Sequence, residues 1–360
     1  MVRILLAVLV AVLMAASAPA PAFAIAAGRP ADPAATPWFV TFDSCGGTLI
    51  APDRVLTAAH CVADNVPADL GPVDVAGAPG QSPLVTAISV HPRFDLDAFS
   101  RLENGWADHD VAVLQLDRAV AGVTPVRLGR ARAGQDLQVV GRGATGGGAA
   151  PGVRGRPLLA ATLRTQSDAA CARFWRTYRD GHDRDSFEAR LMLCGVDPRA
   201  GGRRRRDTCT GDSGGPAFVR DRRGAVRQVG VTSWGAGRCG GGAPSVFAEV
   251  AAERAFIDRR RQPWAPVPAG RPMLTGTFAV GATLTCTPPA WTIAPDRASV
   301  VFFTFRFREG ERTVQRGTST GYVVRPADGG ATIGCRIEAS TAGGRVRHHA
   351  PERVRVLPSP

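Results

Sequence analysis

One segment of the sequence places a serine between glycines, close to two carboxylates and a cysteine. Residues 207–216 read DTCTGDSGGP, a composition that disfavours a helix or an ordinary strand and favours a rigid loop. A serine hydroxyl is a weak nucleophile until a positioned base removes its proton, so Ser213 needs a histidine and a carboxylate from elsewhere. His60, in TAAHC, and Asp110, which begins DVAVL, are the candidates. Asp108 is a competing acid, but the apolar run after Asp110 favours Asp110.

The elements that must position these residues are predicted to be short strands. Between residues 38 and 257, runs rich in Val, Leu and Ile alternate with Gly, Pro and Asp, a pattern typical of an all-β sandwich or barrel. A single closing helix is expected over 251–260, with Phe256 and Ile257 facing inward. The expected strands are 39–42, 48–50, 84–90, 111–116, 137–140, 228–233 and 245–250.

The order His, Asp, Ser and the wording of the three segments resemble the trypsin/chymotrypsin family of serine proteases. The resemblance covers residues 25–262 and implies two six-stranded barrels followed by a C-terminal helix, with the site between the barrels. It also implies a secreted serine endopeptidase in which Ser213 attacks the peptide carbonyl to give an acyl-enzyme, His60 carries the proton and Asp110 orients His60. The amides of Gly211 and Ser213 would form the oxyanion hole.

The same resemblance assigns residues that contact the substrate. Asp207, six residues before the nucleophile, matches the base of the primary specificity pocket. A buried carboxylate there selects Arg or Lys, because a neutral side chain would leave it unpaired. Ser233, Trp234 and Gly235 match the segment that borders the substrate, and Ser233 is also expected to hydrogen-bond the catalytic aspartate.

Two positions depart from the family pattern around this pocket. Ser245 stands where trypsin-type pockets have glycine, which narrows the pocket, and Arg238 lies near its mouth, where it would repel basic substrates. Cleavage after Arg or Lys is the favoured expectation. The alternatives are a serine protease of non-basic specificity and a protease-like binding protein with an inert site.

The N-terminus predicts export. Residues 1–24 combine an early arginine, a short apolar run and small residues ending in AFA, which predicts a signal peptide. Cleavage at its end would leave Ile25 as the new terminus, and the resemblance implies that such an amino group pairs with Asp212. The family's usual terminus reads IVGG, whereas here Ala26 and Ala27 separate Ile25 from Gly28. Export itself would then create the activating terminus, and we expect no separate activating cleavage. Cleavage after Ala18 or Ala20 would instead leave a short pro-segment. No later stretch is apolar and long enough to cross a membrane.

The eight cysteines are an even number, which in an exported chain favours disulfides over metal ligands. Spacing alone does not settle their pairing. We expect neither a cofactor nor a metal ion. The resemblance implies three pairs and leaves a fourth for a second domain: Cys45 with Cys61, Cys171 with Cys194, Cys209 with Cys239, and Cys286 with Cys335.

The sequence changes character after residue 262. Residues 263–269 are proline-rich and read as a stiff linker. Residues 270–360 then alternate apolar and polar positions: Phe303, Phe305 and Phe307 would share one strand face. With its two cysteines, this region resembles bacterial immunoglobulin-like modules, which are small β-sandwiches.

The formal net charge is +13, and arginine supplies all 44 basic residues. The excess is spread along the chain, whereas nucleic-acid binders concentrate charge among aromatic residues. We therefore expect no nucleic-acid partner and, after signal removal, no membrane partner. The expected partners are protein or peptide substrates, and a cell-wall or extracellular polymer is a candidate partner of the C-terminal module.

Overall fold

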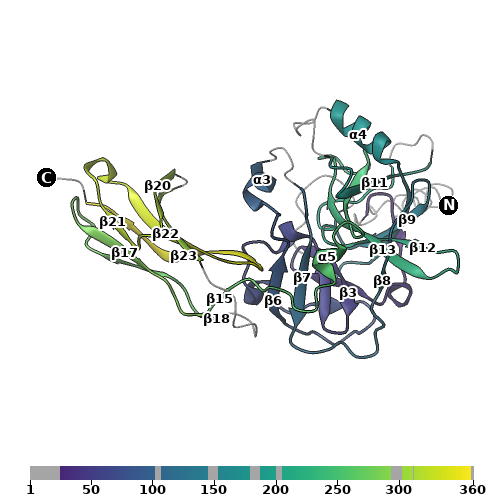
Figure 1. Ribbon diagram of the computed structural model, residues 1–360, viewed down its shortest axis with the longest axis horizontal. Helices are drawn as coiled ribbons and strands as arrows, with labels where there is room; N and C mark the ends of the chain where they lie inside the picture. The colour runs from purple at the N-terminus through teal and green to yellow at the C-terminus, as the bar shows by residue number, and fades with distance from the viewer. Residues whose placement is uncertain are drawn as a thin grey trace, which may run out of the picture.

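The computed structural model describes residues 25–101, 107–144, 153–178, 187–199, 205–292, 302–310 and 312–357. The predicted signal peptide, residues 1–24, lies outside these ranges. Strands dominate the described chain and form two barrels, with a smaller β-sandwich to one side of them (Figure 1). The predicted all-β fold is confirmed. Within the described residues, no helix has the length and hydropathy needed to span a bilayer.

The first barrel has six strands, paired in the order β5-β2-β3-β4-β7-β6. All of these pairings are antiparallel. β2 is buried along its whole length, Thr41 included, so both of its faces lie inside the protein. The strands are β2 (Phe39–Phe42), β3 (Cys45–Ala51), β4 (Arg54–Thr57), β5 (Asp74–Val75), β6 (Val85–Val90) and β7 (Ala112–Leu116).

The second barrel follows the order β1-β10-β11-β14-β13-β12-β9, and β9 also pairs with β10, which closes the ring. β8 pairs in parallel with β13 outside this ring. Each of the seven predicted strands overlaps an observed strand of one of the two barrels. The second set is β1 (Arg29–Pro30), β8 (Arg127–Leu128), β9 (Asp136–Gly141), β10 (Leu159–Thr165), β11 (Met192–Val196), β12 (Pro216–Arg220), β13 (Val226–Trp234) and β14 (Ser245–Glu249).

The helices are short, and the closing helix is shorter than predicted. It spans Arg254–Ile257 (α5) rather than 251–260. The residues before it form a turn that ends at Glu253. The side chain of Glu253 contacts two histidines and does not cap the helix. Phe256 and Ile257 are buried as expected. The other helices are η1 (Pro33–Ala35), η2 (Ala59–Cys61), α2 (Pro67–Leu70), α3 (Leu96–Arg101), α4 (Asp168–Thr177) and η3 (Pro326–Asp328).

The sandwich has a three-stranded sheet, β16-β17-β21, and a four-stranded sheet, β20-β19-β22-β23. Phe305 and Phe307 lie in the core that both sheets share, as the alternation predicted. A short pair, β15-β18, lies beside them. The strands are β15 (Val267–Pro268), β16 (Met273–Gly276), β17 (Thr283–Thr287), β18 (Trp291–Thr292), β19 (Phe302–Glu309), β20 (Arg312–Gly317), β21 (Gly321–Val323), β22 (Thr332–Thr341) and β23 (Gly344–Arg355).

The chain between the barrels and the sandwich is packed against both. Trp264 and Ala265 are buried. The amide of Ala265 donates to the carbonyl oxygen of Ile88 in the first barrel (2.8 Å), and the hydroxyl of Thr341 in β22 donates to the carbonyl oxygen of Trp264 (2.7 Å). Segment 263–269 therefore forms part of the contact between the two regions.

Four disulfides link the strands and loops of this fold, in the pairing that the resemblance implied. The last of them connects β17 to β22 across the sandwich core. The pairs are Cys45–Cys61, Cys171–Cys194, Cys209–Cys239 and Cys286–Cys335.

Candidate active site

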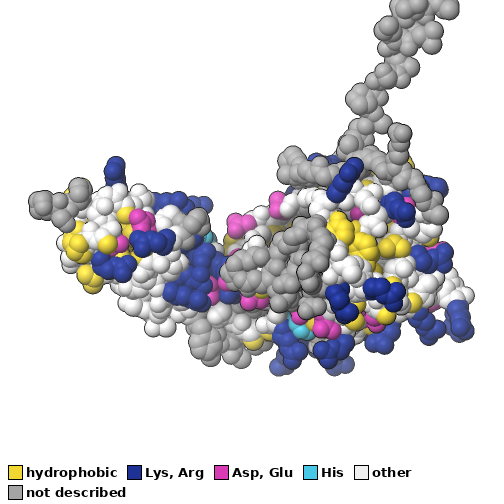
Figure 2. Space-filling model, turned by 90° about the horizontal axis from the view of Figure 1, so that it is seen from above, with side chains coloured by type: hydrophobic (Ala, Val, Ile, Leu, Met, Phe, Trp, Pro, Cys, Tyr) yellow, Lys and Arg dark blue, Asp and Glu magenta, His cyan; other side chains and the backbone are white. Residues whose placement is uncertain are grey.

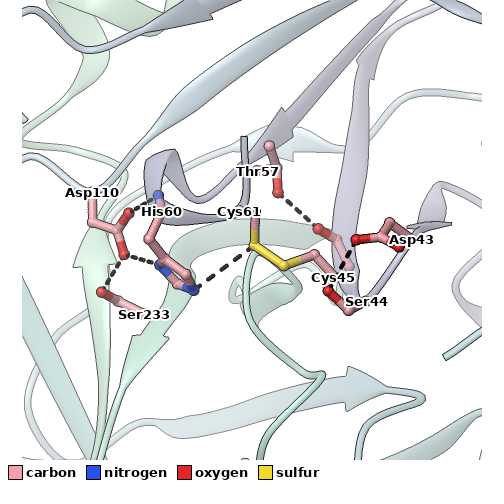
Figure 3. The surroundings of a disulfide bond; sticks show 9 residues. Asp43, Ser44, Cys45, Thr57, His60, Cys61, Asp110 and Ser233 are labelled. Carbon is pink, nitrogen blue, oxygen red and sulfur yellow. Dashed lines mark hydrogen bonds and ion pairs between the residues drawn. A yellow bond between two sulfur atoms is a disulfide. The ribbon is translucent and has the colours of Figure 1, made fainter. Parts of the chain in front are cut away.

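The three predicted catalytic residues come from both barrels. His60 lies in η2, directly after β4, and Asp110 lies just before β7 of the same barrel. Ser213 precedes β12 in the second barrel. The Cys45–Cys61 disulfide ties the short helix of His60 to β3 (Figure 3). The first barrel therefore carries the predicted base and acid, and the second carries the predicted nucleophile.

Asp110 is fully buried, and both of its oxygens accept hydrogen bonds. Its Oδ1 accepts from the amide of His60 (2.9 Å), and its Oδ2 lies 2.7 Å from His60 Nδ1. The hydroxyl of Ser233 donates to the same Oδ2 (2.5 Å), so the carboxylate lies between His60 and Ser233 in Figure 3. This contact fixes the tautomer in which Nδ1 carries the proton and leaves Nε2 free to accept one.

Ser213 is held against the first barrel through its neighbours. Its carbonyl oxygen accepts from the amide of Gly46 (2.7 Å). Gly214 follows with φ +76°, and a Cβ there would lie 2.2 Å from the hydroxyl of Thr57, so only glycine fits. Among the described residues no hydrogen bond joins His60 to Ser213; His60 Nε2 instead lies 3.8 Å from the sulfur of Cys61. In enzymes without substrate such catalytic contacts are often long.

The loop before Ser213 has the backbone shape that an oxyanion site needs. Gly211 has φ +91°, and a Cβ there would lie 2.9 Å from the Cα of Gly143 and 2.8 Å from a methyl group of Val153. Neither the amide of Gly211 nor that of Ser213 donates a hydrogen bond to a described residue. Both predicted oxyanion donors are thus uncommitted within the described part of the chain.

Asp212 points away from the nucleophile into the second barrel and is almost completely buried. Its oxygens accept from the amides of Gly143 and Cys209, each at 2.9 Å. The backbone nitrogen of Ile25, itself fully buried, is a further donor to this carboxylate. Burial raises the pKa of Asp212 to about 7, and these donors oppose that shift. The structure therefore brings together the two residues predicted as the activation pair.

Asp207, the predicted base of the specificity pocket, is buried, with 5% of the residue exposed. The hydroxyl of Ser245 donates to Oδ1 (2.5 Å), and the amide of Gly240 donates to Oδ2 (2.9 Å). Burial raises the pKa of Asp207 to about 6 despite these bonds. Trp234 is buried, whereas Arg238 is exposed.

Two features beside the triad were not predicted. Phe99 of α3 stacks on the ring of His60, with centroids 4.7 Å apart and planes 9° apart. On the other side, Glu253 lies 2.9 Å from His109 Nδ1 and 3.4 Å from His91 Nε2. His109 directly precedes Asp110 and has φ +56°, an unusual conformation for a side chain of its kind.

The cluster of His91, His109 and Glu253 has the donor types of a metal site, but its geometry does not fit one. The two imidazole rings are stacked, with centroids 4.3 Å apart and planes 7° apart. Lone pairs in parallel rings cannot converge on one ion at normal bond lengths. The carboxylate instead hydrogen-bonds His109 and contacts His91, and this fixes the residue next to Asp110.

Comparisons with known proteins agree with this geometry. The family model described as Trypsin matches residues 25–257. The chain is 34% identical over 217 residues to a trypsin of Saccharopolyspora erythraea, which covers 58% of this chain and 82% of that protein. It is 32% identical to trypsin 5G1 of Aedes aegypti over 223 residues (59% and 73%) and 31% identical to trypsin-1 of Astacus astacus over 226 residues (58% and 84%). The chain belongs to the trypsin family and is a serine endopeptidase, a hydrolase of peptide bonds.

Proposed function

We propose that the chain is a secreted endopeptidase that cleaves after Arg or Lys through an acyl-enzyme. The observation that carries the chemistry is the buried Asp110, hydrogen-bonded to both His60 and Ser233. With Nδ1 engaged, Nε2 of His60 takes the proton of Ser213 as its oxygen attacks the peptide carbonyl. The same proton then passes to the leaving amine, and water releases the acyl group by the reverse sequence.

The oxyanion of each tetrahedral intermediate is assigned to the amides of Gly211 and Ser213. Their lack of other described partners supports this role. One such donor typically contributes about 3 kcal/mol to the transition state.

The preference for basic residues is assigned to Asp207, with Ser233, Trp234, Gly235 and Ser245 bordering the substrate. A buried carboxylate that is paired only by hydrogen bonds is stabilised most by a cationic side chain. The same contacts favour one alternative, because the 2.5 Å bond from Ser245 partly satisfies this carboxylate. A pocket that prefers neutral side chains is therefore the second candidate.

Activation is assigned to the pairing of a free Ile25 amino group with Asp212. The backbone nitrogen already lies at the carboxylate in the uncut chain, and a free ammonium there would stabilise the charged form that burial disfavours. Cleavage of the predicted signal peptide during export would thus also activate the enzyme. N-terminal sequencing of the secreted protein tests this, and any mature terminus other than Ile25 contradicts it.

The domain plan that we propose is a signal peptide (1–24), a protease domain (25–262), a linker (263–269) and an immunoglobulin-like domain (270–360). Four disulfides support an extracellular location. The last domain is the proposed contact with a cell-wall or extracellular polymer.

The decisive experiment is cleavage of a mixed peptide library by the secreted chain, beside Ser213→Ala and Asp207→Ser. We expect cutting after Arg and Lys, loss of all cutting with Ser213→Ala, and loss of the basic preference with Asp207→Ser. Cutting after neutral residues by the unaltered chain would favour the second candidate. No cutting by a chain that begins at Ile25 would instead indicate an inert, ligand-binding relative.

A further inference from the structure

One face of the four-stranded sheet of the sandwich carries arginines in register. Arg306 of β19 pairs with Arg316 of β20 on one side and with Arg336 of β22 on the other, and Arg336 pairs with His349 of β23. Residues paired directly across antiparallel strands share a face of the sheet. This row therefore lies opposite the apolar core. Basic side chains gather on this part of the sandwich, beside the barrels (Figure 2).

Like charges placed directly opposite one another destabilise a sheet, so this row calls for compensating anions. Glu338 lies on the same face, and Arg306, Arg345 and Arg347 share its carboxylate. Arg345 and Arg347 also pair with Asp64 and Asp97 of the first barrel, whereas Arg336 has no acidic partner among the described residues. The Nε atoms of Arg306 and Arg336 are buried and have no hydrogen-bond partner among the described residues. Donors of this kind are costly unless a ligand or water satisfies them.

The local potential is correspondingly positive. Burial is the main cause that lowers the pKa of Arg336, to about 10, and the neighbouring Arg347, Arg306 and Arg308 add to it. Burial also lowers the pKa of His349, again with help from nearby arginines. An anion bound on this face would reverse both shifts.

A second row next to the first contains a recess. Gly334 of β22 pairs with Arg308 on one side and with Arg353 on the other. Because glycine has no side chain, a cavity of about 90 Å³ opens there, and His349 also lines it. No described residue that lines the cavity is acidic. Its volume is roughly that of three water molecules, enough for one small oxyanion.

We propose that this face binds a linear phosphodiester polymer, with one phosphate in the recess between Arg308 and Arg353 and the next over Arg306 and Arg336. The two rows are two residues apart along the strands, or roughly 7 Å, which sets the spacing of the charges. Arg306 and Arg336 lie on neighbouring strands about 4.8 Å apart, whereas Arg308 and Arg353 flank Gly334 on strands about 9.6 Å apart. A phosphodiester carries its charge on two non-bridging oxygens, so it can pair with two guanidinium groups at once.

The two rows contain no Phe, Tyr or Trp among their described residues, and Phe305 and Phe307 of β19 lie in the core. Proteins that bind single-stranded nucleic acids stack bases on such rings. The face therefore fits a polymer of alternating phosphates and small polyols better than a nucleic acid. This binding is independent of peptide hydrolysis, which takes place in the barrels.

The first test measures binding of poly(glycerol phosphate) to the full chain by titration calorimetry. We expect the double variant Arg308→Gln with Arg353→Gln to bind at least about tenfold more weakly. Arg222→Gln with Arg223→Gln is the matched control, since it removes the same charge from an exposed turn of the second barrel and should bind like the unaltered chain. Equal losses in both pairs would overturn the proposed site.

The second test separates the recess from general charge attraction. Gly334→Leu fills the cavity but keeps every arginine, and a Cβ at this position meets ordinary contacts of 3.6 Å or more. We expect it to weaken binding as much as the arginine pair does, while peptide hydrolysis and the melting temperature of the sandwich stay unchanged. Undiminished binding by a folded Gly334→Leu chain would refute the proposal. Tighter binding of polyglutamate or of oligothymidine than of poly(glycerol phosphate) would also refute it, in favour of a carboxylate polymer or a nucleic acid.

Discussion

The perturbation with the most extensive consequences is Arg347→Gln in β23. The Arg347 guanidinium crosses from the sandwich to the first barrel, where Nη1 lies 2.8 Å from Asp64 and Nη2 lies 2.5 Å from Asp97. Its Nε lies 3.2 Å from Glu338 of its own sheet. The side chain is 10% exposed, and burial raises the pKa of Asp64 against the pull of the arginines.

The loss of docking free energy in Arg347→Gln depends on the charges that remain unpaired. Removing one member of a buried ion pair typically costs about 3–5 kcal/mol, because the remaining charge stays buried and unpaired. Asp97 is one-third exposed and Arg345 still reaches both acids at 3.7 Å, so solvent and the second arginine reduce the loss. We expect about 2–3 kcal/mol against docking of the sandwich on the barrels.

Hydrogen exchange and small-angle scattering measure this loss. Asp97 lies in α3, the helix that places Phe99 on the ring of His60, so the amides of α3 should exchange faster while the strands of the second barrel do not change. The radius of gyration should rise as the sandwich detaches. Arg355→Gln, an exposed change on the same strand, is the control. If Arg347→Gln and Arg355→Gln gave the same exchange rates and radius, the ion-pair reasoning would be wrong.

Three further outcomes concern the site and the sandwich. The KM for Arg substrates should rise as the pH falls through about 6, where Asp207 takes up a proton, and Ser245→Ala should move this inflection to higher pH because it removes a bond that favours the charged form. Glu253→Gln should lower kcat by about tenfold and leave KM unchanged, because the glutamate that holds the residue next to the catalytic aspartate is weakened. Steady-state kinetics measure both constants, and a change in KM with kcat unchanged would contradict this reasoning. Replacing Cys286 and Cys335 by serine should destabilise the sandwich by about 2–4 kcal/mol, seen by calorimetry as a lower melting temperature for that region alone.

The site and the strands could be predicted from the sequence where the residues that form them are adjacent in the chain. The loop around Ser213 needs glycine at two positions for backbone shape, and both the glycines and the serine are visible in one short string. The strands were equally visible, because the apolar runs in β2 and β7 are bounded by turn residues. The disulfide pairing, by contrast, came from the family resemblance, since spacing alone allows many connectivities.

The parts that escaped prediction depend on partners far apart in the chain. Glu253 reaches His109 across 144 residues, and Arg347 reaches Asp97 across 250. From the sequence alone, each of these residues would be predicted to be a solvent-exposed charged residue on a turn or strand. The closing helix was predicted too long for the same reason, since nothing local shows that the Glu253 side chain is drawn away from the helix end.

One of these distant pairs holds the residue next to the catalytic aspartate in place. Asp110 keeps its contacts with His60 and Ser233, while the neighbouring His109 is held by a carboxylate that comes from the end of the second barrel. The strained φ of His109 persists because its ring is stacked on His91 and hydrogen-bonded to the buried Glu253. Local sequence motifs thus determine which groups react. Contacts between residues far apart in the chain determine how precisely those groups are positioned.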